Sequence, residues 1–240
     1  MSQWIAKWKF ALEHRNAFSV AKPFPHAVLD DFLPPVLADL ALLHFPPADS
    51  PVWRVAGNRH TEHKAVVDYG PLKCKELQFT PEQMCVFQYL NGCPMVKFLE
   101  TLTSIIGLLP DPHFVEGGFH CVGPQGRLNV HADFSHHART GLERRVNLLL
   151  YLNPDWQPGY GGELKLYDES VQPVVTVEPV FNRCVIFATS DTSYHGHPEP
   201  MTAPGWFRRR SIALYYYALP RPERAKKQIY FPTDPEFPNA

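Results

Sequence analysis

Three side chains of this sequence are suited to binding one metal ion. His131 and Asp133 are separated by one residue, and His195 lies further along the chain. If the first pair lies in a strand, residues i and i+2 point to the same face, so the imidazole and the carboxylate converge while Ala132 points away. Two imidazoles and one carboxylate on one face of a metal leave the other face open, an arrangement typical of iron sites that carry out oxidations. We therefore expect His131, Asp133 and His195 to be the metal ligands.

His197 competes with His195 for the third ligand position. Both histidines follow the apolar run Cys184–Ala188, and both would face the same way in an extended chain. Pro198 restricts the backbone of His197 and marks the start of a turn. The sequence therefore favours His195.

A second group of polar residues is typical of carboxylate binding. Arg208, Arg209 and Arg210 lead into Ser211 and the apolar and aromatic run 212–217, which predicts a strand. Alternation places Arg209 and Ser211 on one face and the other two arginines on the opposite, solvent-facing side. A guanidinium fork matches a carboxylate, and a serine hydroxyl adds a hydrogen bond. Arg209 and Ser211 are thus suited to the C5 carboxylate of 2-oxoglutarate.

The composition is that of an ordinary globular chain with one core. The 240 residues are 45% hydrophobic and 20% charged, and the formal net charge of −1 gives no overall attraction to nucleic acid or to an acidic membrane. The five cysteines are odd in number and form no Cys-Xaa-Xaa-Cys pair, which argues against a disulfide framework and a structural zinc site. No leader-like segment or apolar run of membrane-spanning length is present, so we expect a cytoplasmic protein without nucleic-acid or membrane partners.

Prolines and glycines divide the sequence into short elements. The 25 prolines argue against long helices, and short β-branched and aromatic runs begin near residue 115. A glycine-rich segment, 159–162, predicts a hairpin. The expected elements are a strand within 23–31, a helix after Leu33 with apolar positions Val36, Leu37, Leu40 and Leu43, two helical pieces between 81 and 106 that are separated at 91–94, and strands at 118–122, 128–132, 145–152, 163–167, 174–177, 184–188 and 211–219.

This order of elements predicts a mainly β fold with flanking helices. We expect a double-stranded β-helix core, of the jelly-roll or cupin-like kind, buttressed by N-terminal α-helices. The expected organisation is a single domain, 1–240, with a helix-rich support at 1–114, the core at 115–219 and a tail at 220–240 that is an extended strap or partly disordered.

Several other polar residues are candidates for the site. Asn147 lies at the centre of an apolar strand and needs partners, either a cosubstrate carboxylate or neighbouring backbone. His136 and His137 are close enough in sequence to Asp133 to line the mouth of the site, although loop histidines are more often solvated. The candidate entrance residues are Phe134, His136, His137, Arg139, Trp156 and Tyr160.

Segments spread over most of the chain carry a family resemblance. Residues 23–34, 117–120, 128–134, 144–155, 181–187, 193–200 and 209–217 together resemble the bacterial branch of the prolyl 4-hydroxylase-like iron(II)/2-oxoglutarate dioxygenases. The resemblance spans about residues 23–219. It implies Fe(II) bound by His131, Asp133 and His195, 2-oxoglutarate as cosubstrate anchored by Arg209, O2 as oxidant and ascorbate as a candidate reductant.

The resemblance also implies a reaction, the hydroxylation of an unactivated C–H bond with release of succinate and CO2. Animal prolyl hydroxylases commonly place a lysine where this chain has Arg209, so we expect a small metabolite or a glycan-linked group as the substrate. Asp133 argues against the related halogenases, which leave that position to a halide. The alternatives are a peptidyl-prolyl hydroxylase of the same superfamily, a zinc-dependent cupin-type hydrolase that would not use Arg209 and Ser211, and a non-catalytic module that binds 2-oxoglutarate or senses oxygen.

Overall fold

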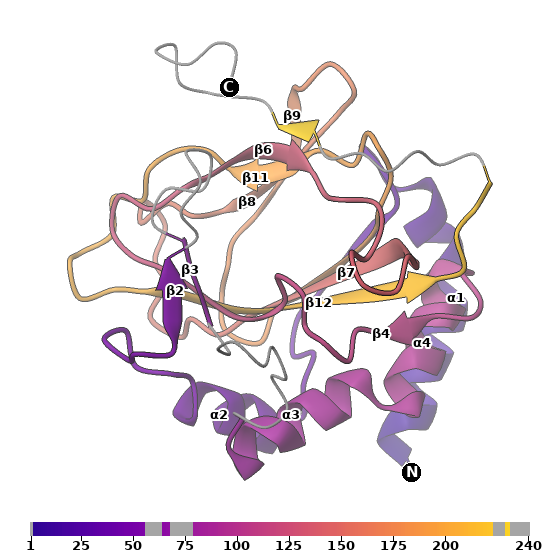
Figure 1. Ribbon diagram of the computed structural model, residues 1–240, viewed down its shortest axis with the longest axis horizontal. Coiled ribbons are helices and arrows are strands. Elements are labelled where there is room, and N and C mark those ends of the chain that lie inside the picture. The colour runs from indigo at the N-terminus through magenta and orange to yellow at the C-terminus, as the bar shows by residue number, and fades with distance from the viewer. Residues whose placement is uncertain (1, 56–63, 68–78, 223–228, 231–240) are drawn as a thin grey trace.

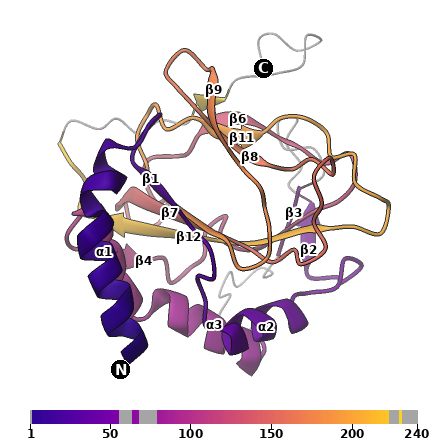
Figure 2. The same cartoon turned by 180° about the vertical axis from the view of Figure 1, so that it is seen from behind.

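Two antiparallel sheets that face each other form the centre of the molecule. The computed structural model describes residues 2–55, 64–67, 79–222 and 229–230. Within these residues the helices lie against the outer face of the larger sheet, and the smaller sheet lies on its other side (Figures 1 and 2). The predicted mainly β fold with flanking N-terminal helices is therefore confirmed.

In the view of Figure 1 the larger sheet lies between the helices below it and the smaller sheet above it. No strand pairing joins the two sheets in the described part of the chain. In spatial order, the larger sheet contains β1 (His26–Leu29), β10 (Cys184–Ala188), β7 (Glu143–Tyr151), β12 (Arg209–Ala218), β5 (Gly118–Val122), β3 (Lys64–Val67) and β2 (Trp53–Val55), with β4 (Leu109–Pro110) paired to β12. The smaller sheet contains β13 (Ile229–Tyr230), β6 (Leu128–Ala132), β11 (His195–His197), β8 (Leu164–Tyr167) and β9 (Pro173–Val177).

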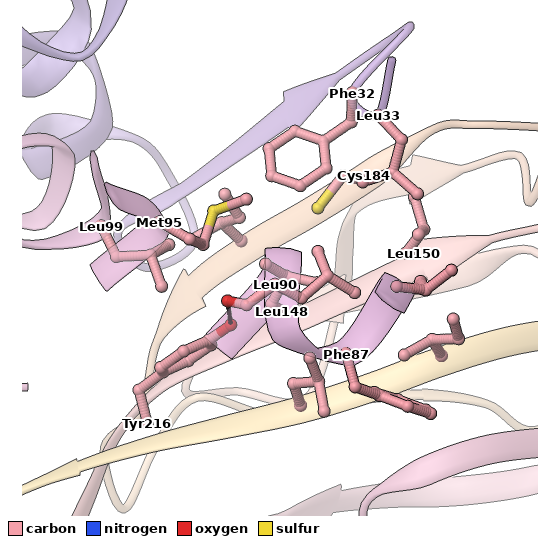
Figure 3. Packing of buried hydrophobic residues seen from close by; sticks show 14 of the residues in the cluster. Phe32, Leu33, Phe87, Leu90, Met95, Leu99, Leu148, Leu150, Cys184 and Tyr216 are labelled. Carbon is pink, nitrogen blue, oxygen red and sulfur yellow. Dashed lines mark hydrogen bonds between the residues drawn. The ribbon is translucent and has the colours of Figure 1, made fainter. Parts of the chain in front are cut away.

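The alternation of side chains along the central strands separates the core from the inner face. On β7, β10 and β12 the even-numbered residues pack toward the helices, because successive side chains of a strand point to opposite faces. Odd-numbered residues such as Tyr151 and Phe187 point toward the smaller sheet and contact Leu164 and Leu166. Figure 3 shows the helix side of this arrangement, with Phe32, Leu33, Phe87, Leu90, Met95 and Leu99 packed around Leu148, Leu150, Cys184 and Tyr216.

In the described part of the chain, four helices cover the outer face of the larger sheet. They are α1 (Ser2–Val20), α2 (Pro35–Leu43), α3 (Pro81–Asn91) and α4 (Cys93–Thr103). Thr80 and Gln83 form a capping box that satisfies backbone N–H groups at the start of α3. The predicted break between α3 and α4 is confirmed at Gly92, where a Cβ atom would lie 2.7 Å from the carbonyl oxygen of Gln88.

Two details of the helical layer differ from expectation. The first helix, α1, was not predicted from the sequence. In α2, the side chains of Val36 and Leu43 are 77% and 78% exposed, while Ala38 and Ala41 are buried. The prediction was therefore wrong for Val36 and Leu43, but Leu37 and Leu40 pack against the core beside the buried alanines.

The predicted hairpin at residues 159–162 is also wrong. This segment follows β7 of the larger sheet and precedes β8 of the smaller sheet, so it connects the two sheets instead of joining two paired strands. Gly159, Gly161 and Gly162 have φ values of 91°, 76° and 80°, which glycine adopts without steric cost. The glycines thus allow the chain to cross from one sheet to the other.

The tail and the cysteines are only partly described. Most of the predicted strap at 220–240 lies outside the described residues, but β13 pairs with β6, which places Tyr230 opposite His131 in the register. Arg221 forms an ion pair with the buried carboxylate of Glu143.

The described cysteines, Cys85, Cys93, Cys121 and Cys184, are not in disulfides. None of the described helices is long and apolar enough to cross a bilayer.

Candidate metal centre

Two neighbouring strands of the smaller sheet bring the candidate ligands together. His131 lies in β6 and His195 in β11, and the register makes them direct partners across the strand pair. Asp133 follows immediately after the last residue of β6. The candidate ligand atoms of these three residues all lie within 4.8 Å of one another. The structure therefore brings together the three side chains that the sequence singled out, and His197 is not part of this cluster.

Both imidazoles turn the same nitrogen toward the carboxylate. Nδ1 of His131 donates to the carbonyl oxygen of Asn129 at 2.8 Å, and Nδ1 of His195 donates to that of Ser193 at 2.9 Å. Because a carbonyl oxygen can only accept, the proton lies on Nδ1, and Nε2 carries the lone pair through which an imidazole binds a metal. The Nε2 atoms lie 3.6 Å and 3.5 Å from oxygens of Asp133.

Burial and charge favour the protonation states that a metal needs. His131 and His195 are only 6% and 5% exposed. Burial lowers the pKa of His195 to about 4, so this imidazole is neutral near pH 7. Burial alone would raise the pKa of Asp133, but the guanidinium of Arg144 and the two imidazoles outweigh it and hold that pKa well below its ordinary value. Two imidazoles and an ionised carboxylate form a donor set that fits a divalent transition metal.

Asn147 completes a network behind the carboxylate. Its Nδ2 donates to Oδ2 of Asp133 at 2.6 Å, and its Oδ1 accepts from Nε of Arg144 at 2.7 Å. Its observed partners are therefore two side chains and not the neighbouring backbone that the sequence offered as one alternative, while a contact with a cosubstrate carboxylate stays a prediction. Asp133 and Arg144 also contact each other, with Nη2 of Arg144 3.0 Å from Oδ2 of Asp133.

Arg209 and Ser211 lie in the same cavity as the metal-ligand cluster. Their positions on β12 place both side chains on its inner face, and they are 5% and 4% exposed. Nε of Arg209 donates to the carbonyl oxygen of Gly162 at 2.6 Å, and its Nη2 donates to the hydroxyl of Tyr151 at 3.3 Å. The cavity thus combines a candidate metal site with a buried guanidinium suited to an anionic ligand.

The candidate entrance residues do not line this cavity. None of the six candidates is part of its described lining, which excludes Phe134, His136, His137, Arg139, Trp156 and Tyr160. His137 is 2% exposed and lies 3.2 Å from Asp111, so its predicted solvation was wrong. Its Nδ1 accepts two backbone N–H groups of the loop after Asp133, a local fold that the sequence pattern does not show.

The remaining entrance candidates also lie elsewhere. Trp156 is buried against Met201 and Phe207, because the loop before β8 folds onto the start of β12. His197, which the sequence weighed as a ligand, does line the cavity, as does His120.

Tyr151 and Arg144 are among the cavity residues that sequence reasoning missed. Tyr151 could have been found, since it lies four residues after Asn147 on a predicted strand and therefore on the same face. Arg144 could not, because simple alternation places it on the opposite face from Asn147.

Comparison with known sequences finds a family model and curated relatives that match part of this chain. Residues 117–217 match the family model described as the 2OG-Fe(II) oxygenase superfamily. Prolyl 3-hydroxylase OGFOD1 of Mus musculus is 34% identical over 104 residues, which are 40% of this chain and 18% of the mouse protein. The match thus spans less than a fifth of that relative's length.

Solved structures share the fold over most of the chain. A prolyl-4-hydroxylase of Pseudomonas putida superposes with a TM-score of 0.57 at 18% identity, over 87% of this chain and 99% of that chain. A prolyl hydroxylase of Trichoplax adhaerens, solved with a peptide fragment of the hypoxia inducible factor, gives 0.55 at 18% identity, over 90% of this chain and 93% of that chain. The predicted double-stranded β-helix fold is confirmed by these likenesses.

Proposed function

We propose that this chain is an iron(II)- and 2-oxoglutarate-dependent dioxygenase that hydroxylates an unactivated C–H bond. The match of residues 117–217 to the family model of the 2OG-Fe(II) oxygenase superfamily supports this proposal. One observation carries the proposal. A cluster of two histidines and one aspartate shares its cavity with a buried arginine and a serine, so a metal and a dicarboxylic acid could bind side by side.

The three clustered residues would hold the metal. His131 and His195 use Nδ1 for their backbone hydrogen bonds and would bind the metal through Nε2, and Asp133 supplies the negative charge. Bound iron would supply the activation of dioxygen, coupled to the decarboxylation of 2-oxoglutarate to succinate. The protein contributes a facial ligand set that leaves coordination positions open, in surroundings that exclude bulk water.

Arg209 would hold the far carboxylate of 2-oxoglutarate. The carbonyl oxygen of Gly162 and the hydroxyl of Tyr151 fix the orientation of its guanidinium, and Ser211 lies two residues further on the same face of β12. A fixed guanidinium loses little side-chain entropy when it binds a carboxylate. This second anchor favours the dioxygenase over a zinc-dependent hydrolase, which would leave Arg209 and Ser211 without a role.

For the substrate we favour a prolyl residue of a peptide or protein. The mouse relative is named a prolyl 3-hydroxylase, and two proteins of the same fold are named prolyl hydroxylases. These names support the alternative that the sequence kept open. A small metabolite or glycan-linked group, expected from the arginine at position 209, is the competing prediction.

The test is an oxygenation assay with purified protein, Fe(II), 2-oxoglutarate and isotopically labelled dioxygen. A library of proline-containing peptides and a set of small metabolites are offered in parallel, and succinate and labelled oxygen are followed by mass spectrometry. We expect a peptide that gains labelled oxygen together with succinate, and neither product with Asp133→Ala. Labelled oxygen in a metabolite alone would contradict the prolyl substrate. A protein that binds neither metal nor 2-oxoglutarate would contradict the dioxygenase itself.

A further inference from the structure

A bulge in β7 turns Arg144 toward the metal-ligand cluster. In the pairing of β7 with β12, Tyr216 lies opposite Val146, but Tyr217 lies opposite Arg144, so Arg145 is skipped. Without this bulge, Arg144 would share the face of Val146 and point toward the helices. Bulges re-aim single side chains and occur often beside active sites.

The re-aimed guanidinium is buried among aromatic rings. Arg144 is 1% exposed, and its Cζ atom lies 3.4 Å from the ring centroid of Tyr215 and 4.7 Å from that of Phe134. A buried guanidinium is costly unless it is paired and hydrogen-bonded. Its Nη2 lies 3.0 Å from Oδ2 of Asp133, and its Nε donates to the amide oxygen of Asn147.

The two oxygens of Asp133 therefore have different surroundings. Oδ2 faces both Asn147 Nδ2, at 2.6 Å, and Arg144 Nη2, at 3.0 Å. Oδ2 thus carries one hydrogen bond and one ion pair, and it also lies 3.5 Å from Nε2 of His195. Oδ1 faces Nε2 of His131 at 3.6 Å and makes neither of these contacts.

We propose that Arg144 and Asn147 are positioning residues that restrict Asp133 to binding the metal through Oδ1 alone. The hydrogen bond from Arg144 also orients the Asn147 amide, so that its NH2 group and not its oxygen faces Asp133. A carboxylate that bound through both oxygens would occupy one further coordination position. We call Arg144 and Asn147 the clamp. The clamp keeps that position open for the cosubstrate or dioxygen, which the facial arrangement requires.

This inference rests on the proposed metal site, and its test uses a metal that needs no turnover. Mn(II) is added to the full chain without oxygen or 2-oxoglutarate, and water-proton relaxation counts the exchangeable waters on the bound ion. We expect Asn147→Leu and Arg144→Met each to lose about one metal-bound water relative to the wild type. Arg144→Lys, which keeps a charge and a donor, should retain the wild-type count. Arg210→Met serves as the matched control, because that side chain lies on the opposite face of β12.

The outcomes separate the clamp from the metal site. A wild-type water count in both Asn147→Leu and Arg144→Met would overturn the clamp and leave the metal site standing. A wild-type protein that binds no Mn(II) would instead overturn the proposed function, and the clamp with it. Circular dichroism verifies folding. If Arg144→Met does not fold, Asn147→Leu decides the question, because it leaves the ion pair between Arg144 and Asp133 in place.

Discussion

At the scale of single residues, each candidate ligand is prepared by a hydrogen bond of its own. Each of the two histidines donates a hydrogen bond from Nδ1 to the carbonyl oxygen two residues earlier in the chain. Asp133 is held by Asn147 and Arg144. Ligands that are fixed before the metal arrives lose little conformational entropy on binding, so the site is preorganised.

Protonation of His195 should destabilise the metal-free protein in mild acid. Burial lowers its pKa from 6.5 to about 4. Between these two pH values the unfolded chain therefore binds a proton that the folded chain does not bind. The difference of about 2.5 pKa units, at about 1.36 kcal/mol each, corresponds to about 3 kcal/mol. The full stability is present above pH 6.5 and is lost as the pH falls toward about 4. Urea unfolding across this range should show the fall, and His195→Gln should flatten it; an unchanged slope in that variant would refute the assignment.

Replacing Arg209 should weaken 2-oxoglutarate binding and leave metal binding intact. Arg209→Ala removes a buried charge from the cavity, and losing one partner of such a pair costs about 3 kcal/mol, or about two orders of magnitude in affinity. Anaerobic calorimetry with 2-oxoglutarate measures this, with Mn(II) affinity as the internal control. Equal affinity for 2-oxoglutarate in wild type and variant would show that the anchor lies elsewhere.

At the scale of elements, alternation along strands decides which side chains reach the site. The predicted strands 118–122, 128–132 and 184–188 coincide with β5, β6 and β10, so the convergence of His131 and Asp133 follows from a local pattern. Pairing of β6 with β11, which brings His195 to His131, depends on contacts distant in sequence. The bulge that re-aims Arg144 breaks the period of two, which is why no sequence pattern could reveal it.

The loop between the two sheets offers a sharp test of how Arg209 is positioned. At Gly162, with φ of +80°, an added Cβ would lie 2.8 Å from Cδ of Arg209; at Gly159, with φ of +91°, it would meet nothing within 4 Å. Both alanine variants strain the backbone similarly, by about 1 kcal/mol or more. Only Gly162→Ala should weaken 2-oxoglutarate binding, by about tenfold if the displaced guanidinium loses about 1.4 kcal/mol of binding. Similar affinities in the two variants would contradict a positioning role for this contact.

At the scale of the whole molecule, the helical layer supports the sheet from which the cosubstrate site is built. Tyr216 of β12 donates its hydroxyl to the carbonyl oxygen of Leu90 near the end of α3, at 2.8 Å (Figure 3). Its neighbours Tyr215 and Tyr217 point to the opposite face, toward the candidate site. The strand β12 thus contacts the helical layer on one face and the candidate site on the other.

Removing this connection should affect stability and not the site. Tyr216→Phe leaves a buried carbonyl without its partner, which costs about 1–2 kcal/mol. Urea unfolding should show this loss, with Mn(II) and 2-oxoglutarate affinities unchanged. A weaker metal affinity in the folded variant would show that the helical layer also shapes the metal centre.

The central claim is that three side chains hold a metal while Arg209 holds a dicarboxylic acid beside it. A crystal structure of the protein soaked with iron(II) and 2-oxoglutarate without oxygen tests it most directly. We predict a metal bound to Nε2 of His131, Nε2 of His195 and Oδ1 of Asp133, with the far carboxylate of 2-oxoglutarate against Arg209 and Ser211. A metal bound at other residues, or a dicarboxylate that does not contact Arg209, would contradict the claim.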